Sequence, residues 1–298
     1  MLTLDEILGI VYLQLTGIGF LGNLTLLILN SFNFLTAHTV RPKNVIIIQL
    51  AFSNAMVLLF VGTPTITRLW KVKCVLDRTG IKIITYMQRL SRGLSLNSTC
   101  LLNVFQAITI SLNNSLWAQV KIKAPKTIIR CIVLCWIFHL IFHMHIFLRH
   151  DGPKNSTVSK DGCRTGYRTL DVYNNNHIKF QIITFVHDTF FVGLMTASSV
   201  HMVLILYRHR RNLNHIHSKS TSTKISPEMR ATKSILLLVA TFVLFNTFSR
   251  ICIICMLFVK SINMWMIHTI VLLALCYPTV SPFILVSINK QVPNSCAC

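Results

Sequence analysis

Acidic residues are scarce in this chain, which has eight Asp and Glu against 29 Lys and Arg in 298 residues. All charged residues together make up 12% of the sequence, about half of the roughly 25% that is typical of soluble domains. A chain with so little charge cannot place most of its surface in water. We therefore expect the lipid bilayer to be its main partner.

Sequence motifs that support enzyme chemistry are also missing. There is no glycine-rich phosphate loop, no nucleophile elbow and no paired-carboxylate site, and Asp188 is the one acidic residue inside a hydrophobic run. A retinal-binding pigment would need a Schiff-base lysine within the last hydrophobic run, whereas Lys260 and Lys290 lie on either side of it. We expect no enzymatic activity and no cofactor.

The chain is instead dominated by seven hydrophobic runs of about the length, roughly 20 residues, that a helix needs to cross the hydrocarbon. Single helices satisfy their own backbone hydrogen bonds in lipid, so the runs predict helices. The expected fold class is an all-α membrane protein, a single seven-transmembrane-helix bundle over residues 1–298. The expected spans are about 7–30, 44–67, 83–110, 131–148, 180–207, 231–259 and 265–288.

The charges that flank the first run predict its orientation. Residues 1–6 contain Asp5 and Glu6 but no Lys or Arg, which is unlike the basic start of a signal peptide. Arg41 and Lys43 follow the run, and cytoplasmic flanks are usually basic. We expect an extracellular N-terminus and a cytoplasmic C-terminus, although over the whole chain the basic residues are divided almost evenly between the two sides.

The connection between the fourth and fifth runs has two features of an extracellular loop. Asn155 begins an Asn-Ser-Thr glycosylation site, and Cys163 lies in the same loop. Cys74 is the other cysteine that this topology places on the oxidising side, so Cys74 and Cys163 are the candidate disulfide.

The basic residues concentrate in short loops, and one of these loops is a candidate docking surface. The net charge of +21 would suggest nucleic acid in a soluble chain, but no basic helix or stacking platform forms here, so we expect no nucleic-acid partner. The connection 208–230 is rich in Arg, His, Ser and Thr, which predicts a solvated and mobile segment. Pro227 suits the first turn of the helix that follows.

Ionisable residues inside spans are costly and usually functional, which draws attention to Arg89, Arg92, Asp188 and Arg250. Gln88, Arg89 and Arg92 lie on one helical face. We predict a ligand-binding site at Gln88, Arg89, Arg92 and Asp188, and an excess of positive charge that favours neutral or anionic small molecules. The alternative is that Asp188 pairs with Arg89 or Arg92 and joins the third and fifth spans.

Three histidines, His139, His143 and His145, fall in the fourth run. A pair at i and i+4 can bind zinc, but Leu140 stands where the zinc-protease pattern requires Glu. We therefore expect packed or interfacial histidines and no metal site.

Several blocks of sequence are more specific than composition. They include QLAFSN at 49–54, RGLSL at 92–96, VFQAITIS at 104–111, SPEMRAT at 226–232 and SPF at 281–283, together with 41–42, 99–102, 187–188, 191–195, 207–209 and 215–217. These blocks resemble vomeronasal type 1 receptors, and the resemblance covers nearly the whole chain. Ile81 stands where that family usually has a cysteine, so Cys74 would have to replace it in the disulfide.

The resemblance implies a G-protein-coupled receptor in the plasma membrane of chemosensory neurons. It implies a pheromone-like small-molecule ligand and a heterotrimeric G protein of the inhibitory type. The residues that we predict to dock the G protein lie on the cytoplasmic side, and they are Gln106, Lys121, Lys123, Arg208, Arg210, Arg211 and Arg230.

Two other functions fit seven spans. A bitter-taste-like receptor would also lack the usual switch motifs, but the block at 226–232 argues against it. A small transporter or channel would normally show internal repeats or a polar pore stripe, and we find no such duplication.

Overall fold

The computed structural model describes residues 3–36, 42–70, 78–111, 115–144, 175–216, 227–259 and 264–289. Within these ranges nearly every residue is helical, and seven helical segments are long and apolar enough to cross a membrane. The expectation of an all-α seven-helix bundle is therefore confirmed. The elements are α1 (Leu4–Thr36), α2 (Pro42–Val57), η1 (Leu58–Gly62), α3 (Thr63–Leu69), α4 (Arg78–Ile110), α5 (Ser115–His143), α7 (Asn175–Ile216), α8 (Pro227–Val259) and α9 (Met264–Asn289).

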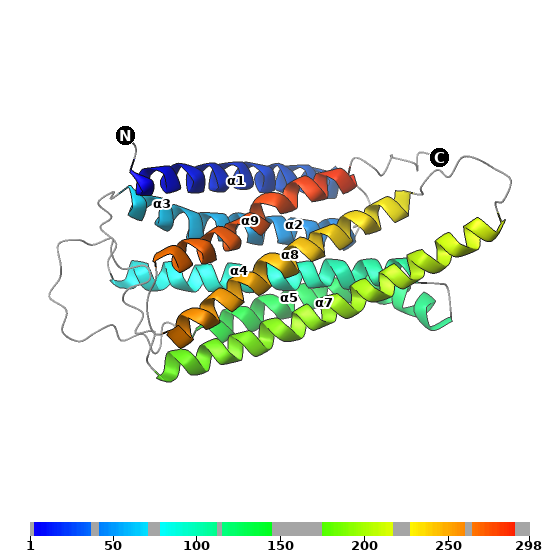
Figure 1. Cartoon of the computed structure of the whole chain (residues 1–298). Helices are drawn as coiled ribbons and strands as arrows, with labels where there is room; N and C mark the ends of the chain where they lie inside the picture. Colours follow the sequence, from blue (N-terminus) through cyan, green and yellow to red (C-terminus); the bar gives the residue numbers. More distant parts are fainter. Residues whose placement is uncertain are drawn as a thin grey trace.

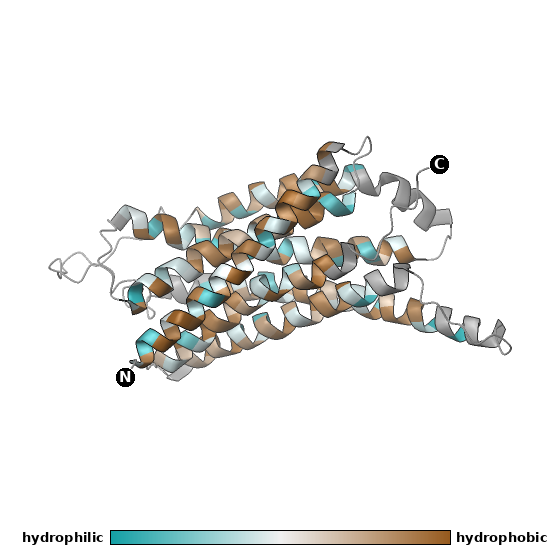
Figure 2. Cartoon of the chain, turned by 90° about the horizontal axis from the view of Figure 1, so that it is seen from above, coloured by the Kyte–Doolittle hydropathy of each residue, from teal (hydrophilic) through white to brown (hydrophobic). Residues whose placement is uncertain are grey.

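The helices lie lengthwise beside one another, with α1 beginning at one end of the bundle and α9 ending at the other (Figure 1). Hydrophobic residues predominate along the helices, with polar ones interspersed (Figure 2). Many large apolar side chains are exposed, among them Ile141, Phe190 and Leu237. Lipid would cover these side chains, since a soluble monomer rarely exposes apolar patches of such extent.

Several helices extend beyond the hydrophobic runs, which corrects one expectation. Residues 208–216 belong to α7, so the basic connection that was expected to be mobile from 208 onward starts as helix. Similarly α5 begins at Ser115, and Lys121 and Lys123 lie on that helix. Hydropathy measures only how far a helix is immersed in lipid, whereas backbone hydrogen bonding continues outside it. The helix α8 does begin at Pro227, as expected.

The second span is not a uniform α-helix, because a π-helical turn, η1, separates α2 from α3. Pro64 has no N–H and so cannot donate the helical hydrogen bond to the carbonyl of Phe60. The side-chain amide of Gln88 on α4 donates to that carbonyl instead, at 2.6 Å. In lipid this replacement matters, since an unsatisfied backbone carbonyl is costly there.

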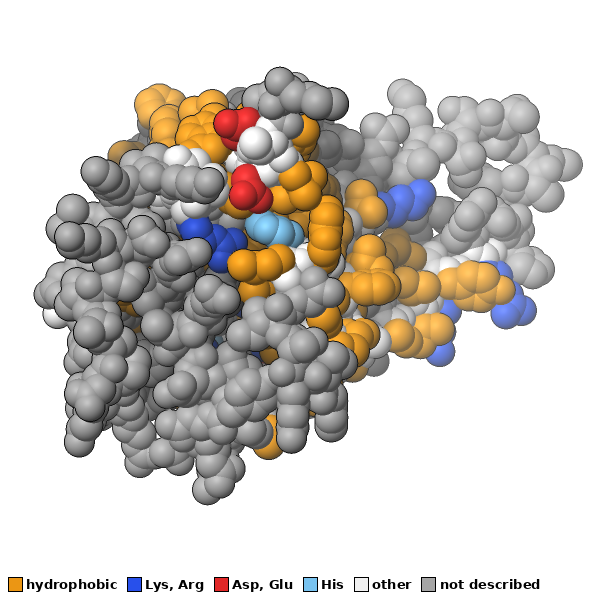
Figure 3. Space-filling model, turned by 60° about the vertical axis from the view of Figure 1, so that its left-hand side comes forward, with side chains coloured by type: hydrophobic (Ala, Val, Ile, Leu, Met, Phe, Trp, Pro, Cys, Tyr) orange, Lys and Arg blue, Asp and Glu red, His pale blue; other side chains and the backbone are white. Residues whose placement is uncertain are grey.

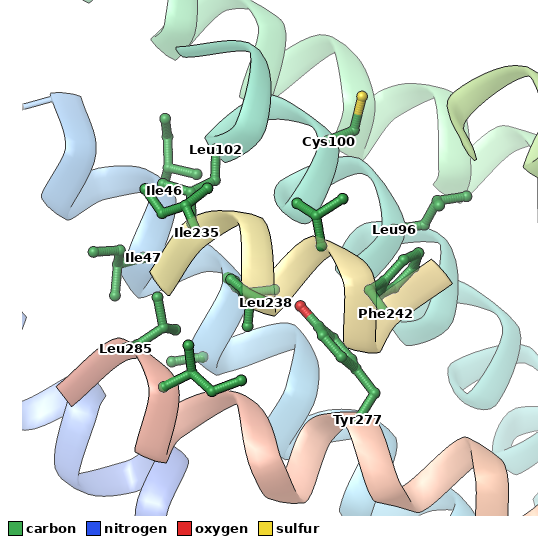
Figure 4. Close-up of a cluster of buried hydrophobic side chains, with 14 of the residues drawn as sticks. Ile46, Ile47, Leu96, Cys100, Leu102, Ile235, Leu238, Phe242, Tyr277 and Leu285 are labelled. Carbon is green, nitrogen blue, oxygen red and sulfur yellow. The ribbon is translucent and has the colours of Figure 1, made fainter. Parts of the chain in front are cut away.

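The main core lies between α2, α4, α8 and α9. Figure 4 shows side chains from these four helices meeting around Leu238 and Tyr277. The ring of Tyr277 stands edge-on to Phe242, with centroids 4.7 Å apart, and its hydroxyl lies 2.7 Å from that of Thr99. This pairing satisfies a buried phenol inside an apolar cluster and joins α9 to α4.

Two prolines lie within α9, Pro278 and Pro282. Pro282 cannot donate to the carbonyl of Pro278, and the amide of Asn23 on α1 donates to that carbonyl at 2.8 Å. Nearby, Asn54 of α2 donates to Ser281 at 2.8 Å and accepts from Ser95 at 2.6 Å. Buried amides and hydroxyls therefore tie α1, α2 and α4 to the part of α9 that the prolines weaken.

Candidate functional site

A cavity of about 460 Å³ lies near the end of the bundle at which α1 begins. This volume is within the range of roughly 300–1,000 Å³ that is usual for small-molecule sites. Its walls come mainly from α4, α5, α7 and α8, and they are mostly apolar. Its ionisable and amide side chains include Gln88, Arg89, Arg92, His139, Asp188 and Arg250. Figure 3 shows charged and histidine side chains among hydrophobic ones at this end of the molecule.

All four residues that the sequence predicted as ligand-binding therefore line one cavity, although their role in binding remains a prediction. Arg89, Arg92 and Gln88 project from α4, and Asp188 faces them from α7. The amide nitrogen of Gln88 is already engaged with the carbonyl of Phe60. Gln88 thus stabilises the π-helical turn and presents only its remaining hydrogen-bonding capacity to the cavity.

The carboxylate of Asp188 forms an ion pair with Arg250 of α8. Both residues are predicted from the sequence as functional charges, but the partners predicted for Asp188 are Arg89 and Arg92 and not Arg250. His187 lies on the other side of the carboxylate, with Nδ1 3.2 Å from Oδ1. Each side chain of the ion pair is 20% exposed, so the pair is mostly shielded. It connects α7 to α8 within the cavity wall.

Histidine and aromatic side chains bridge α5 to α4 and α7. His139 is buried, and its Nε2 lies 2.7 Å from the amide nitrogen of Asn97. Its ring lies over Gly93, where a Cβ would collide with it, so the glycine permits the close approach of α5 to α4. His139 also stacks on His143 at 5.7 Å and meets His187 edge-on at 5.4 Å.

The expectation of packed histidines holds for His139 and His143, while His145 lies outside the described residues. Among the residues that the structure describes, no group of three His, Cys, Asp or Glu is placed to hold a metal ion. Besides α4, α7 and α8, the helix α5 contributes to the cavity wall, which the sequence does not predict. The i, i+4 spacing of His139 and His143 was the available signal, because it predicts that both rings share one helical face.

The other end of the bundle carries the predicted docking residues. Arg208 and Arg211 are exposed on the extension of α7. Gln106 is only 6% exposed and donates to the hydroxyl of Thr232 on α8 at 3.3 Å, so it links two helices rather than facing outward. The remaining four, Lys121, Lys123, Arg210 and Arg230, lie on helices, but their side chains are outside the described part of the chain.

The predicted disulfide residues Cys74 and Cys163 and the predicted glycosylation site at Asn155 are likewise outside the described residues. Ile81, which stands where the resembling family usually has a cysteine, is half-buried in the first turns of α4. These modifications stay predictions.

The fold is also found in a solved structure. The structure matches the crystal structure of squid rhodopsin with a TM-score of 0.70, covering 95% of this chain and 78% of that one at 16% sequence identity. At that identity the match concerns the fold alone. Seven apolar helices in this arrangement, with a cavity toward one end, give this chain the seven-transmembrane fold of that rhodopsin.

The sequence profile of the vomeronasal organ pheromone receptor family matches residues 6–298, and the chain belongs to this family. Human vomeronasal type-1 receptor 1 is 35% identical over 97% of this chain and 82% of its own length. Human vomeronasal type-1 receptor 4 is 35% identical over 95% of each chain. Zebrafish olfactory receptor class A-like protein 1 is 29% identical over 97% of this chain and 92% of its own length. The protein is thus a multi-pass chemosensory receptor of the plasma membrane and does not belong to an enzyme family.

Proposed function

We propose that this receptor binds small pheromone-like molecules, neutral or anionic, in the cavity between α4, α5, α7 and α8. The observation that carries the proposal is the charge of the cavity lining. Arg89, Arg92 and Arg250 contribute three positive charges, Asp188 contributes one negative charge, and the sum over these described residues is +2. A carboxylate, sulfate or carbonyl oxygen gains charge-assisted hydrogen bonds from such a lining, whereas an ammonium ion is repelled.

Ligand binding shifts the balance between two helix arrangements. The pair between Asp188 and Arg250 joins α7 to α8 at the cavity, and the bond from Gln106 to Thr232 joins α4 to α8 near the other end. A ligand acceptor that binds Arg250 competes with Asp188 and changes how α8 is held. Only the difference in the ligand's affinity for the two arrangements drives the shift.

The G protein docks at the end opposite the cavity. It is of the inhibitory type, as the resemblance to vomeronasal type 1 receptors implies. The helix α7 continues from Arg208 to Ile216, eight further residues and about 12 Å at 1.5 Å per residue. This extension carries the exposed Arg208 and Arg211, and Lys121, Lys123, Arg210 and Arg230 join them as docking residues. The proposed orientation places this end in the cytoplasm and the N-terminus outside.

Arginine variants test the ligand site. A ligand is first found by screening small acids and neutral volatiles in cells with a G-protein readout, with and without pertussis toxin, which blocks inhibitory-type coupling. Arg89→Ala or Arg92→Ala should then raise the half-maximal concentration by roughly 10–100-fold, the equivalent of losing a charge-assisted hydrogen bond. Arg68→Ala on α3 is the control, because Arg68 does not line the cavity. Unchanged responses in both cavity variants would contradict the site.

Charge reversal tests the docking surface. Arg208→Glu combined with Arg211→Glu should reduce G-protein activation while leaving ligand affinity unchanged. Lys82→Glu, at the cavity end of α4, is the control, and it should leave coupling intact. If the control variant loses coupling and the double variant keeps it, the proposed orientation is wrong. Antibody labelling of an N-terminal tag on intact cells checks the orientation directly.

A further inference from the structure

Four residues that line the cavity have exposed side chains. They are Phe185 and Thr189 on α7 and Thr247 and Ile251 on α8. Phe185 is 42% exposed and Ile251 is 50% exposed, although both form part of the cavity wall. A cavity-lining side chain with so large an exposed fraction indicates a place where the cavity opens. This mouth, which we call the lateral opening, lies between α7 and α8.

The lateral opening lies within the depth of the membrane and not at its rim. Thr247 lies nine residues, or about 14 Å, inside the apolar span of α8, which ends at Met256, and Ile251 lies five residues, or about 8 Å, inside it. On α7, Thr189 lies eight residues, or about 12 Å, inside the apolar span that begins at Gln181. The hydrocarbon core is roughly 30 Å thick, so these residues face acyl chains.

An apolar groove continues from the lateral opening along the outer face of α7. Phe185 and Thr189 line both the cavity and this groove, whose other walls are Val186, Phe190, Gly193, Leu194 and Ala197. The floor is low at Gly193, where a Cβ would meet no atom within 4 Å. The hydroxyl of Thr189 donates to the carbonyl of Phe185 at 2.8 Å, so no free hydroxyl obstructs the path.

We propose that the lateral opening admits ligands from the bilayer, and that these ligands are amphiphiles with a long apolar body and one neutral or anionic head. Such a molecule already concentrates in lipid, and its apolar body stays in apolar surroundings as it follows the groove. Inside the opening its head meets Asn246 and Arg250, which line the cavity on the same helix as Thr247 and Ile251. This inference rests on the proposed role of the cavity as the ligand site.

Two substitutions narrow the path by different means. Thr189→Trp fills the lateral opening itself, and Gly193→Leu raises the floor of the groove at a position where an added Cβ meets no atom within 4 Å. Replacing a helical glycine also favours the helix, so Gly193→Leu should fold. Gly17→Leu on α1 is its matched control, since a Cβ there also meets nothing within 4 Å, and Val200→Trp on a lipid-facing position of α7 controls for the tryptophan.

The experiment measures how fast a lipid-borne probe reaches the cavity. The full-length receptor is placed in lipid nanodiscs, a diazirine-bearing long-chain fatty acid is added to the lipid, and samples are irradiated at successive times. Mass spectrometry then follows labelling of cavity-lining peptides. Thr189→Trp and Gly193→Leu should slow this labelling by roughly tenfold, which corresponds to about 1.4 kcal/mol in the barrier. Both controls should match the wild type.

A second set of samples in detergent micelles separates failure of the route from failure of the site. There the probe is not confined to a bilayer, and final labelling should be equal in the wild type, in Gly193→Leu and in both controls. Equal rates in nanodiscs for blocked and control variants would overturn the lateral route while leaving the cavity as a ligand site. Labelling in detergent but none in nanodiscs would also overturn the lateral route and leave the cavity as a ligand site. No cavity labelling in either setting would overturn both the route and this ligand class.

Discussion

The ion pair between Asp188 and Arg250 allows a stability prediction whose sign depends on the surrounding charges. Removing one partner of a buried pair leaves an uncompensated charge and typically costs about 3–5 kcal/mol. The two removals are not equivalent here. Asp188→Asn raises the summed charge of the described cavity lining from +2 to +3, whereas Arg250→Gln lowers it to +1.

Asp188→Asn should therefore destabilise the receptor more than Arg250→Gln. The first variant removes the one carboxylate among the described residues that line the cavity and keeps three arginines there, and its cost should lie near 5 kcal/mol, the upper end of the range. The second leaves Asp188 with His187 beside it at 3.2 Å and with Arg89 and Arg92 in the same lining. Its cost should lie near 3 kcal/mol. At about 2 °C per kcal/mol the expected losses in Tm are roughly 10 °C and 6 °C.

The double variant completes a thermodynamic cycle. Because it removes both charges, its loss should be smaller than the sum of the single losses by about 2–3 kcal/mol. Unfolding can be followed in detergent with a thiol-reactive fluorescent dye, since Cys100 is buried in the core and reacts only when the bundle opens. Thr196→Val, a lipid-facing substitution on α7, should stay within about 0.5 kcal/mol of the wild type.

Two outcomes would refute this reasoning. If Arg250→Gln is the more destabilising variant, the excess positive charge of the cavity does not control the cost. If the losses of the two single variants simply add in the double variant, the ion pair contributes no coupling between α7 and α8, and the proposed competition with a ligand loses its basis.

Two more predictions concern the contacts that hold the cavity walls. Gln88→Leu should cost about 1–3 kcal/mol, because it leaves the carbonyl of Phe60 unsatisfied in a proline-containing span, and the measurement is Tm against a Gln181→Leu control. A Tm equal to that of the control would show that the amide does not support the π-helical turn. Gly93→Ala should push the ring of His139 away from α4 and lower both Tm and ligand affinity, whereas His139→Ala in the same background should recover stability. If His139→Ala does not restore the Tm of the Gly93→Ala variant, the added methyl group clashes with a residue other than His139.

Much of the fold could be predicted from the sequence because hydrophobicity is a local property. Each run has to be about as long as the bilayer is thick, whichever helices surround it. The helix start at Pro227 was equally local, since a proline fits the first turn. The predicted mobile segment from residue 208 onward was wrong, because hydropathy does not show where a helix ends outside the membrane. The helix α7 continues through basic residues to Ile216. A solvated composition does not prevent a helix that is already nucleated within the membrane from continuing.

In the candidate site, too, some features could be predicted from the sequence and others depend on helix packing. Helical periodicity alone placed Gln88, Arg89 and Arg92 on one face, and the rarity of charge in lipid singled out Asp188 and Arg250. Which of these charges meet was decided by packing, because Asp188 and Arg250 are 62 residues apart and belong to different helices. The contact of Gln88 with Phe60, the place of His139 over Gly93 and the lateral opening between α7 and α8 depend on the same packing. The sequence determined that seven helices cross a membrane and which polar residues they carry into it, since both follow from transfer into lipid. Only the tertiary structure decided the partners of those residues, since contacts between helices depend on how the helices are rotated and spaced.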